Sequence, residues 1–340
     1  MQQTIHRRTN FDICICLLRL NTIISNASGE RKVVMKIAII GTGAMGSVYA
    51  GVFAEAGHEI WAIDSWSEHI QQIKSHGLTL EGASGNRTIA NLSATTDADE
   101  AGACDLYVIA TKADGVGTAA QAVARNMRED SLILTIQNGL GAGDRIAKFI
   151  DTKNVLLGVA EGFGASIKGP GHAHHNAMRQ IRIGEMNGGM TVRLKTLEAA
   201  WKRAGFNANG FADIHQLIWE KYICNVFLSA PCAVFDCTIG ELVNNTSWRE
   251  IALGCMREAY RAGKAKRINF SFEDADAYAL KFAAVMPEAS PSLRLDHIAR
   301  RKSEIDAING MVPVVSAEVG LSAPYNETLA AVIRRREEAF

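Results

Sequence analysis

Lys221 lies in the stretch LIWEKYICN, residues 217–225, whose other members are mostly apolar. On a helix, its neighbours three and four positions away are Leu217, Ile218, Cys224 and Asn225. Only one of these is polar, and burying an ammonium group is costly. The side chain could therefore run along apolar surface until its head reaches water. Alternatively, the amine could stand at a site that needs a proton donor.

A glycine-rich turn follows the first long apolar run after residue 30. The run VVMKIAII, residues 33–40, is typical of a strand buried on both faces of a parallel sheet, and residues 47–59 have helical apolar spacing. The turn between them consists of Gly41, Thr42, Gly43, Ala44, Met45 and Gly46. A strand, a glycine turn and a helix in this order predict a dinucleotide site, in which the turn and the helix N-terminus hold the pyrophosphate. We expect all six residues to contact the cofactor.

Asp64 ends the next apolar run, IWAID, 18 residues after Gly46. A carboxylate at this distance can accept hydrogen bonds from the adenosine ribose and would repel a 2′-phosphate. The cofactor is therefore expected to be NAD(P)H, with NAD somewhat favoured. The alternative is a solvated aspartate at the end of a strand.

Three more β-prone runs follow, each ended by turn residues: DLYVIATKA, SLILTIQNG and NVLLGVAEGFGAS. This alternation predicts a Rossmann-type doubly wound sheet, whose ligand chemistry collects at the carboxyl ends of the strands. Lys112 and Asn138 stand at two of those ends, where each could serve the site or simply make a turn.

From His215 onward the spacing is helical, including residues 249–269, 272–286 and 292–320. We therefore predict an α/β N-terminal domain over residues 35–211 and an all-helical substrate or catalytic domain over 212–340. Residues 1–34 contain a polar linker and precede a start-like MKIAII. They are expected to be a disordered extension or to lie before the true initiator Met35, with a processed targeting segment as the alternative.

The composition of the chain limits the classes of molecule that it is expected to bind. Thirty-six basic residues balance thirty-six acidic ones, so the total charge favours neither nucleic acid nor an anionic membrane, and a small-molecule partner is expected. The seven cysteines show no zinc-type spacing, which indicates reduced thiols and a cytoplasmic protein. His172, His174 and His175 lack a fourth ligand at suitable spacing, so we expect a hairpin or loop and no metal site. The apolar helices after Trp248 could supply a homodimer interface.

Six segments occur in the order GTGAMG, ATKA, QNGLG, WEKYICN, GEL and SEIDAING. In this set the chain resembles the ketopantoate reductase (2-dehydropantoate 2-reductase) family over almost its whole length after residue 34. The resemblance implies a nicotinamide-binding first domain, a helical second domain and an active site in the cleft between them. The implied reaction is hydride transfer from NAD(P)H to a 2-keto acid, with 2-dehydropantoate as the first choice and pantothenate biosynthesis as the setting.

The resemblance also implies roles for single residues. Lys221 would be the general acid that protonates the ketone oxygen, and Glu304 would orient it or bind substrate. The substrate would be held by Asn225, Ser229, Ser292 and Asn138, while Lys112 and Asn138 would lie beside the cofactor. Lysine suits this role because it can both stabilise developing negative charge and give up a proton, whereas arginine does not release its proton.

Three positions depart from the family pattern. Ser229 replaces a second asparagine, Ile239 stands before GEL where some members carry another asparagine, and Asp64 stands where an arginine reads the 2′-phosphate in NADPH-preferring members. A dehydrogenase of the same fold acting on a different 2-hydroxy or 2-keto acid is therefore an alternative. A protein that only senses the dinucleotide is another.

Overall fold

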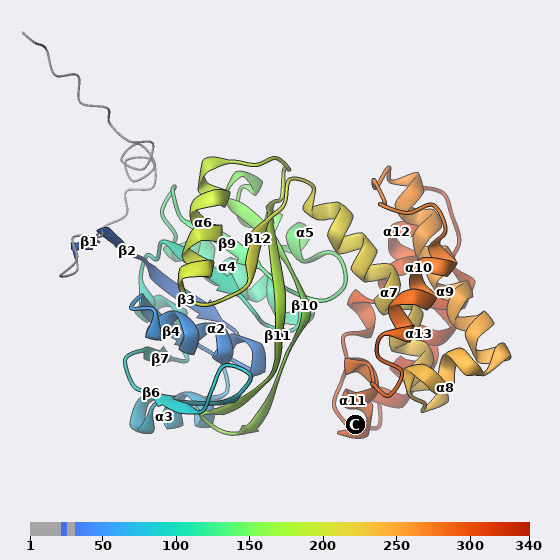
Figure 1. Ribbon diagram of the computed structural model, residues 1–340, viewed down its shortest axis with the longest axis horizontal. Helices are drawn as coiled ribbons and strands as arrows, with labels where there is room; N and C mark the ends of the chain where they lie inside the picture. Colours follow the sequence, from blue (N-terminus) through green and yellow to red (C-terminus); the bar gives the residue numbers. More distant parts are fainter. Residues whose placement is uncertain (1–21, 26–30) are drawn as a thin grey trace, which may run out of the picture. The chain divides into compact units, whose positions relative to one another are not determined.

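The computed structural model describes residues 22–25 and 31–340. These residues form two compact units, coloured along the sequence in Figure 1. The first unit holds the described residues up to Gln137 together with Gly143–Ile214, and the second holds Asn138–Ala142 with His215–Phe340. The segment Asn138–Ala142, which the sequence analysis placed in the first domain, thus belongs to the helical unit.

Residues 1–21 and 26–30, on which most of the predicted extension falls, lie outside the described residues. The strands β1 (Thr22–Ser25) and β2 (Arg31–Val34) pair antiparallel as a separate two-stranded sheet. These strands were not predicted, because SNASGERKVV, residues 25–34, reads as a polar linker.

The first unit alternates strands with helices and short 3-10 turns (η). Its remaining strands are β3 (Lys36–Ile40), β4 (Glu59–Ile63), β5 (Leu78–Gly82), β6 (Arg87–Ile89), β7 (Ser93–Thr95), β8 (Leu106–Ile109), β9 (Leu132–Thr135), β10 (Val155–Gly169), β11 (His172–Glu185) and β12 (Ala208–Gly210). Its helical elements are α2 (Ala44–Glu55), α3 (Ser67–His76), η1 (Ala98–Ala101), η2 (Ala113–Gly115), α4 (Val116–Asn126), α5 (Ala142–Ala147), η3 (Thr152–Asn154) and α6 (Val192–Arg203).

The predicted doubly wound sheet is confirmed. The order β10-β9-β8-β3-β4-β7 is parallel throughout, which corresponds to the Rossmann order 6-5-4-1-2-3 when these six strands are counted along the chain. The chain reverses its winding between β3 and β8, which is the switch point where such sheets bind their ligands. The apolar runs of the sequence form these strands because their residues are buried on both faces.

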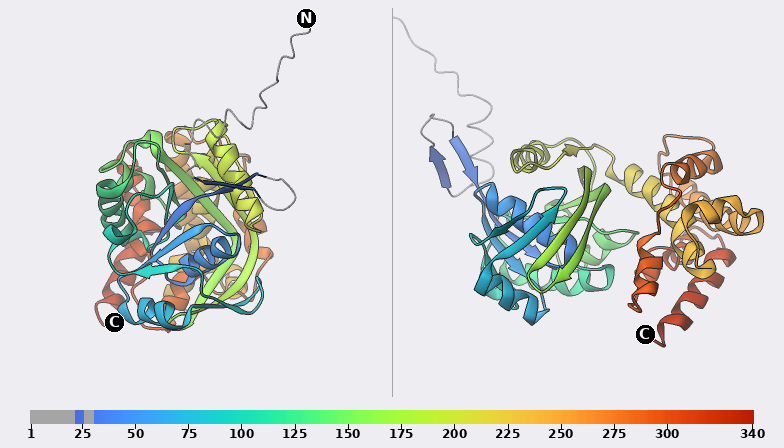
Figure 2. Two further views of the ribbon diagram at one scale, coloured as in Figure 1. Left: turned by 90° about the vertical axis from the view of Figure 1, so that its left-hand side faces the viewer. Right: turned by 60° about the horizontal axis from the view of Figure 1, so that its bottom comes forward.

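A long antiparallel hairpin, β10 with β11, extends the sheet beyond the Rossmann core (Figure 2). β11 then carries β5 and β12 on its outer side, both parallel to it, and β6 completes the edge beside β5. Helix α2 packs against β4, β10 and β11, where Tyr49 and Phe53 contact the fully buried Trp201 of α6. This aromatic cluster fixes the first helix after the glycine turn on the sheet.

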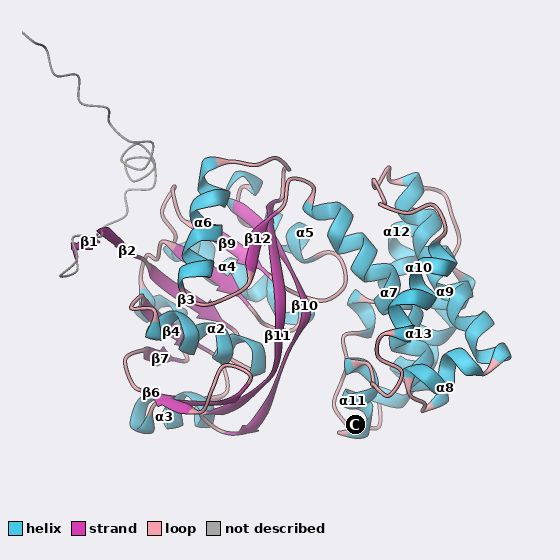
Figure 3. Ribbon diagram, viewed as in Figure 1, coloured by secondary structure: helices cyan, strands magenta, loops and turns pink. Residues whose placement is uncertain are grey.

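Figure 3 shows the second unit as helices joined by loops. Its elements are α7 (Ile214–Phe235), α8 (Ile239–Asn244), α9 (Thr246–Ala265), α10 (Ala275–Ala284), α11 (Ser292–Ile298), η4 (Ile305–Ala307), α12 (Met311–Ala317) and α13 (Pro324–Glu337). The predicted helical domain is confirmed, and α7 runs through its core with Tyr222, Ile223 and Phe227 buried. No helix in the described residues is long and apolar enough to cross a membrane.

One helical expectation is wrong in detail. Residues 292–320 were expected to form amphipathic helix broken by Pro, Gly or Asn. The stretch divides into α11, η4 and α12, and the break after α11 begins at Ala299, which is none of these residue types. Glu304 stands between α11 and α12 and begins η4. Helical periodicity misses such an interruption because its apolar residues, Ile305 and Ile308, are as buried as those of a helix.

Candidate functional site

The glycine turn lies between the carboxyl end of β3 and the start of α2. Gly41 has φ +89°, and a Cβ there would come closer than 3.0 Å to the backbone of Thr111, after β8. A Cβ on Gly46 would collide with the carbonyl oxygen of Gly41, so this glycine is what lets α2 pack close to the strand. A Cβ on Gly43 would meet nothing within 4 Å, which leaves open space at the helix N-terminus.

The start of α2 suits a phosphate. Gly43 is its N-cap, no side chain caps it among the described residues, and its first turn, which includes Ala44 and Met45, holds no acidic residue. Its first N–H groups and the positive end of the helix dipole therefore remain for an anion. The residues at this turn fit the pyrophosphate of a dinucleotide.

The side chain of Thr42 supports the turn. Its side chain is fully buried, and its hydroxyl donates to the carbonyls of Ile39 (3.2 Å) and Ile63 (3.1 Å). The hydroxyl thus holds the turn on β3 and β4. Ser47 adds a second support by donating to the Thr42 carbonyl at 3.1 Å.

His69 of α3 completes this support. Its Nδ1 accepts the backbone N–H of Gly171 at 3.0 Å, and its Nε2 lies 3.3 Å from the hydroxyl of Ser47. Because Nδ1 accepts, the neutral ring carries its proton on Nε2 and donates to Ser47. Burial lowers the pKa of His69, against a smaller opposing effect of the Asp64 carboxylate.

This arrangement predicts a pH dependence of stability. The unfolded chain protonates His69 at a higher pH than the folded chain does, so the free energy of unfolding should decrease as pH falls below about 6.5. Thermal unfolding of the wild type and of His69→Gln, each at pH 7.5 and pH 5.5, would measure the contribution. Between pH 7.5 and pH 5.5, the melting temperature of the wild type should fall further than that of His69→Gln. Equal decreases would contradict the role assigned to His69.

Asp64 and Lys112 lie at the same carboxyl edge of the sheet as the glycine turn. Asp64 follows β4 directly, is half-buried, and accepts the N–H of Trp66 on Oδ1 at 2.9 Å. Lys112 follows β8, is exposed and precedes η2. Gln137, after β9, donates to the carbonyls of Ile109 (2.8 Å) and Thr111 (3.2 Å) and so closes this edge.

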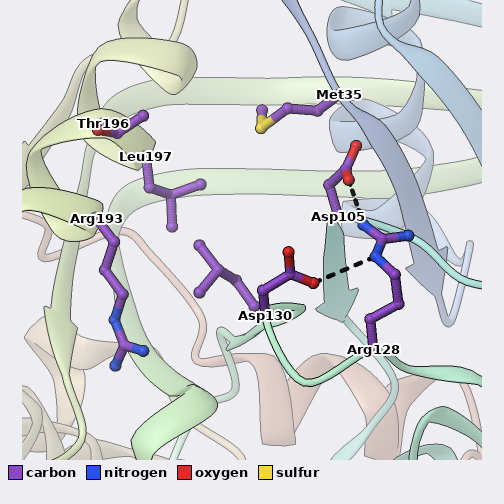
Figure 4. Close-up of a pocket in the computed structure, with 8 residues that line it drawn as sticks. Met35, Asp105, Arg128, Asp130, Arg193, Thr196 and Leu197 are labelled. Carbon is purple, nitrogen blue, oxygen red and sulfur yellow. Dashed lines mark hydrogen bonds and ion pairs between the residues drawn. The ribbon is translucent and has the colours of Figure 1, made fainter. Parts of the chain in front are cut away.

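A small pocket lies at the opposite, amino edge of the sheet (Figure 4). Met35 and Asp105 come just before β3 and β8, and Arg128 bonds both Asp105 and Asp130. The cavity of about 20 Å³ can hold on the order of one water molecule. It is therefore no site for a dinucleotide, and the glycine turn remains the candidate in this unit.

In the second unit, the amine of Lys221 has a defined polar partner. The residue lies in the first half of α7, half-buried, and its Nζ donates to the side-chain Oδ1 of Asn138 at 2.8 Å. If the Lys221 side chain only ran along apolar surface to reach water, its amine would be solvated and would need no such partner. Two residues that are 83 positions apart in sequence are thus brought together.

The segment that carries Asn138 is tightly seated. Leu140 donates its N–H to the carbonyl of Ala307 at 3.0 Å, and a Cβ on Gly139 (φ +82°) would collide with the same carbonyl. The hydroxyl of Tyr222, next to Lys221, donates to the carbonyl of Ile308 at 2.8 Å. The short segment from Glu304 to Ile308 therefore contacts both the Asn138 turn and α7.

The other expected substrate residues lie in the same unit but differ in exposure. Asn225 stands one helical turn after Lys221 and is half-buried, as is Glu304 at the start of η4. Ser292 begins α11 and is exposed, whereas Ser229 is only 4% exposed. Ser229 is thus the least accessible of these candidates.

The three histidines lie in the β10–β11 hairpin region, as expected. All are in β11: His172 is 3.1 Å from Glu81, His174 Nδ1 is 2.8 Å from the Asn176 amide oxygen, and His175 is fully buried against Phe163. Burial lowers the pKa of His175, which favours the neutral ring. The five cysteines in the described residues are all buried and free.

Two family models match the chain, one to each unit. Residues 37–188 match "Ketopantoate reductase PanE/ApbA", and residues 213–337 match "Ketopantoate reductase PanE/ApbA C terminal".

The chain belongs to the ketopantoate reductase family.

It is an oxidoreductase of the ketopantoate reductase type that binds a nicotinamide dinucleotide. The 2-dehydropantoate 2-reductase of Streptococcus pyogenes serotype M18 is 26% identical over 304 residues, which cover 89% of this chain and 98% of the relative. That of Halobacterium salinarum is 26% identical over 300 residues, covering 88% and 98%.

Solved structures agree with the family assignment. A ketopantoate reductase from Ralstonia eutropha JMP134 superposes with a TM-score of 0.82 at 28% identity, covering 90% of this chain and 99% of that chain. D-mandelate dehydrogenase in complex with NADH and anilino(oxo)acetate also has a TM-score of 0.82, at 26% identity and with the same coverage. The fold of this ketopantoate reductase family therefore includes proteins named for different 2-hydroxy acids.

Sequence reasoning missed several residues that shape these sites. Ser47 and His69 support the glycine turn, while Tyr222 and Asn309 tie α7 to the segment after Glu304. A signal for Asn309 was present, since it belongs to SEIDAING, but only Glu304 of that segment was considered. Tyr222 likewise belongs to WEKYICN, but a tyrosine on an apolar helix face is most simply a core residue.

Proposed function

We propose that this chain reduces 2-dehydropantoate to pantoate, with Lys221 as the general acid. The observation that supports the proposal best is the 2.8 Å bond between Lys221 Nζ and Asn138 Oδ1. The amide oxygen of asparagine accepts this hydrogen bond without taking up the proton, so Asn138 orients the amine. The names of the relatives supply the substrate, and the pathway would be pantothenate biosynthesis.

The roles follow from the charge that develops in the reaction. NAD(P)H, when bound, supplies the hydride that reduces C2 of the keto acid. Lys221 stabilises the negative charge that builds up on the ketone oxygen and transfers a proton from Nζ to it. Asn138 holds Nζ in place, and Glu304 orients the amine or binds the substrate. The substrate accepts hydrogen bonds from Asn225 and Ser292. The buried Ser229 contributes less to binding it.

The cofactor would be bound by residues of the first unit. The turn of Gly41, Gly43 and Gly46 and the first N–H groups of α2, at Ala44 and Met45, would hold the pyrophosphate, while Thr42 shapes the turn. Lys112 would lie beside the phosphates or the nicotinamide from the end of β8. We further propose that Asp64 binds the adenosine ribose through Oδ2 and favours NADH over NADPH.

Asp64→Ser is therefore expected to raise the ratio of kcat/KM with NADPH to kcat/KM with NADH. Removing the carboxylate abolishes its repulsion of a 2′-phosphate and one of its bonds to the ribose. We expect a change on the order of tenfold, which corresponds to about 1.4 kcal/mol. Initial rates with both cofactors would measure it, and Asp114→Ser, at an exposed aspartate of η2, is the control. An unchanged ratio would mean that Asp64 does not face the ribose.

The proposal is tested by initial rates with both cofactors and a panel of 2-keto acids that includes 2-dehydropantoate. Oxidation of NADH or NADPH in the presence of 2-dehydropantoate, with kcat/KM above that for the other acids, is expected. Tight dinucleotide binding without turnover on any of the acids would instead favour a dinucleotide-sensing protein.

A second candidate substrate has a specific observation in its favour. Ser229 and Ile239 stand where the family pattern has asparagines; they are 4% and 2% exposed, and neither carries an amide. A less polar site suits a bulkier or more apolar 2-keto acid, and D-mandelate dehydrogenase is among the structural neighbours. Phenylglyoxylate, the keto acid that corresponds to mandelate, therefore belongs in the panel, and a preference for it would identify this second function.

We also propose a cytoplasmic location, in keeping with the soluble composition of the chain and its free, buried thiols. A homodimer is proposed from the apolar helices that follow Trp248. Light scattering of the purified protein would measure the oligomeric state, and a mass equal to one chain would contradict it.

A further inference from the structure

Asn309 is fully buried and its side-chain amide is bonded to helix α7 at two points. Its Nδ2 donates to the carbonyl of Val226 at 2.9 Å, and its Oδ1 accepts the N–H of Ala230 at 3.2 Å. In a regular α-helix these two backbone groups bond to each other, since they are four residues apart. The amide of Asn309 thus bridges one turn of the helix backbone.

The bridged turn of α7 is followed by a proline. Pro231, the next residue, has no N–H and cannot bond the carbonyl of Phe227, and its ring crowds that carbonyl. A proline inside a helix leaves freedom to bend at this turn. Asn309 therefore supports the helix beside a position where one of its own hydrogen bonds is missing.

Asn309 is itself held by a buried chain of polar groups. Its Nδ2 also donates to Asn326 Oδ1 at 2.9 Å, and Asn326 Nδ2 donates to Glu258 at 2.7 Å. Glu258 additionally accepts the N–H groups of Tyr325 and Asn326 at the start of α13. Asn326 is fully buried and Glu258 is 2% exposed. Such a network is rigid when all its members are bonded, so the amide of Asn309 has a fixed orientation.

The same segment is fixed to α7 a second time. Asn309 follows Ile308, whose carbonyl accepts the hydroxyl of Tyr222, one residue after Lys221. The bonds at Tyr222 and at Val226 and Ala230 lie on either side of Asn225. They fix the part of α7 that carries the residues proposed to act on the substrate. Since Leu140, in the Asn138 turn, bonds Ala307, the segment also fixes the acceptor of the Lys221 amine.

We infer that Asn309 is a positioning residue: by bridging Val226 and Ala230 it holds the helix of Lys221 at a fixed place relative to Glu304 and Asn138. It touches neither substrate nor cofactor. The inference rests on the proposed role of Lys221 as proton donor and extends it. A general acid must meet the ketone oxygen within hydrogen-bond distance, and a displacement of about 1 Å can cost up to 100-fold in rate.

The test is a double-mutant cycle on the rate of hydride transfer, measured in single turnovers with 2-dehydropantoate. Asn309→Ala should lower this rate roughly 10- to 100-fold while the dissociation constant of the dinucleotide stays unchanged. In the Lys221→Ala background, Asn309→Ala should cause no further loss, because it acts only through the amine. Losses that multiply would overturn the inference and leave the role of Lys221 intact.

Asn326→Ala is the matched control, since it removes an amide of equal burial from the same network without touching α7. It should lower the melting temperature as Asn309→Ala does, yet cost less than the roughly tenfold rate loss expected for a displaced acid. If Asn309→Ala does not fold, Tyr222→Phe removes the other tie by a single hydroxyl and should show the same dependence on Lys221. A Lys221→Ala variant as fast as the wild type would overturn both this inference and the proposed function.

Discussion

Replacing Lys221 with alanine is expected to lower kcat by roughly 100-fold or more, the usual loss when a positioned general acid is removed. The dissociation constant of the dinucleotide should change little, because the amine is assigned to the ketone oxygen. Steady-state rates with 2-dehydropantoate, together with fluorescence titration of the cofactor, would separate the two effects. A variant that keeps its kcat would remove Lys221 from the mechanism.

Lys221→Arg tests why the residue is a lysine. A guanidinium keeps the positive charge but does not release its proton at neutral pH. The arginine variant should therefore remain well below the wild type in kcat even if it binds the keto acid. Asn138→Ala is the complementary change, since it leaves the amine in place and removes its 2.8 Å acceptor. A smaller loss than for Lys221→Ala is expected, because the proton donor is still present.

Alanine at Gly43 and at Gly46 should give opposite results. A Cβ on Gly43 meets nothing within 4 Å, so Gly43→Ala should fold normally but place a methyl group where the pyrophosphate approaches the backbone. Losing one charge-assisted hydrogen bond costs about 1.5–3 kcal/mol, so we expect cofactor affinity to fall roughly 10- to 100-fold. Isothermal titration with NADH and NADPH would measure the loss.

A Cβ on Gly46 meets the carbonyl of Gly41 instead. Gly46→Ala should therefore destabilise the first unit, by roughly 1–3 kcal/mol if the helix can shift to relieve the contact. Thermal unfolding of both variants provides the comparison. A Gly43→Ala protein that melts early but binds normally would contradict the assignment of the open space to the cofactor.

The Rossmann core was predictable from sequence because its physical causes are local. Ile37 to Ile40 are buried, so the run KIAII reads as an apolar strand, and Gly41 and Gly46 mark places where a Cβ has no room. The hairpin of β10 and β11 was only partly foreseen, because β11 mixes Arg, Gln and His with apolar residues. The pairing of β5 with β11, 93 residues later, leaves no local signal.

The candidate site was predicted only in part. The apolar surroundings of Lys221 indicated an unusual amine, and the resemblance supplied Asn138, but their bond joins distant segments that no spacing connects. The same holds for Asn309, whose partners in α7 lie 79 and 83 positions away. Such contacts depend on how η4 interrupts the stretch from Ser292 to Gly320, and helical periodicity does not reveal that interruption.

The inclusion of Asn138–Ala142 in the helical unit constrains how related proteins can be recombined. The peptide chain passes from one unit to the other three times, at 137/138, 142/143 and 214/215. A chimera made by exchanging everything after residue 214 would combine the Leu140 turn of one parent with the Ala307 loop of another. If residues 138–142 are exchanged together with the helices, the bond between Leu140 and Ala307 joins residues of the same parent. Such chimeras are better suited to exchanging substrate preference.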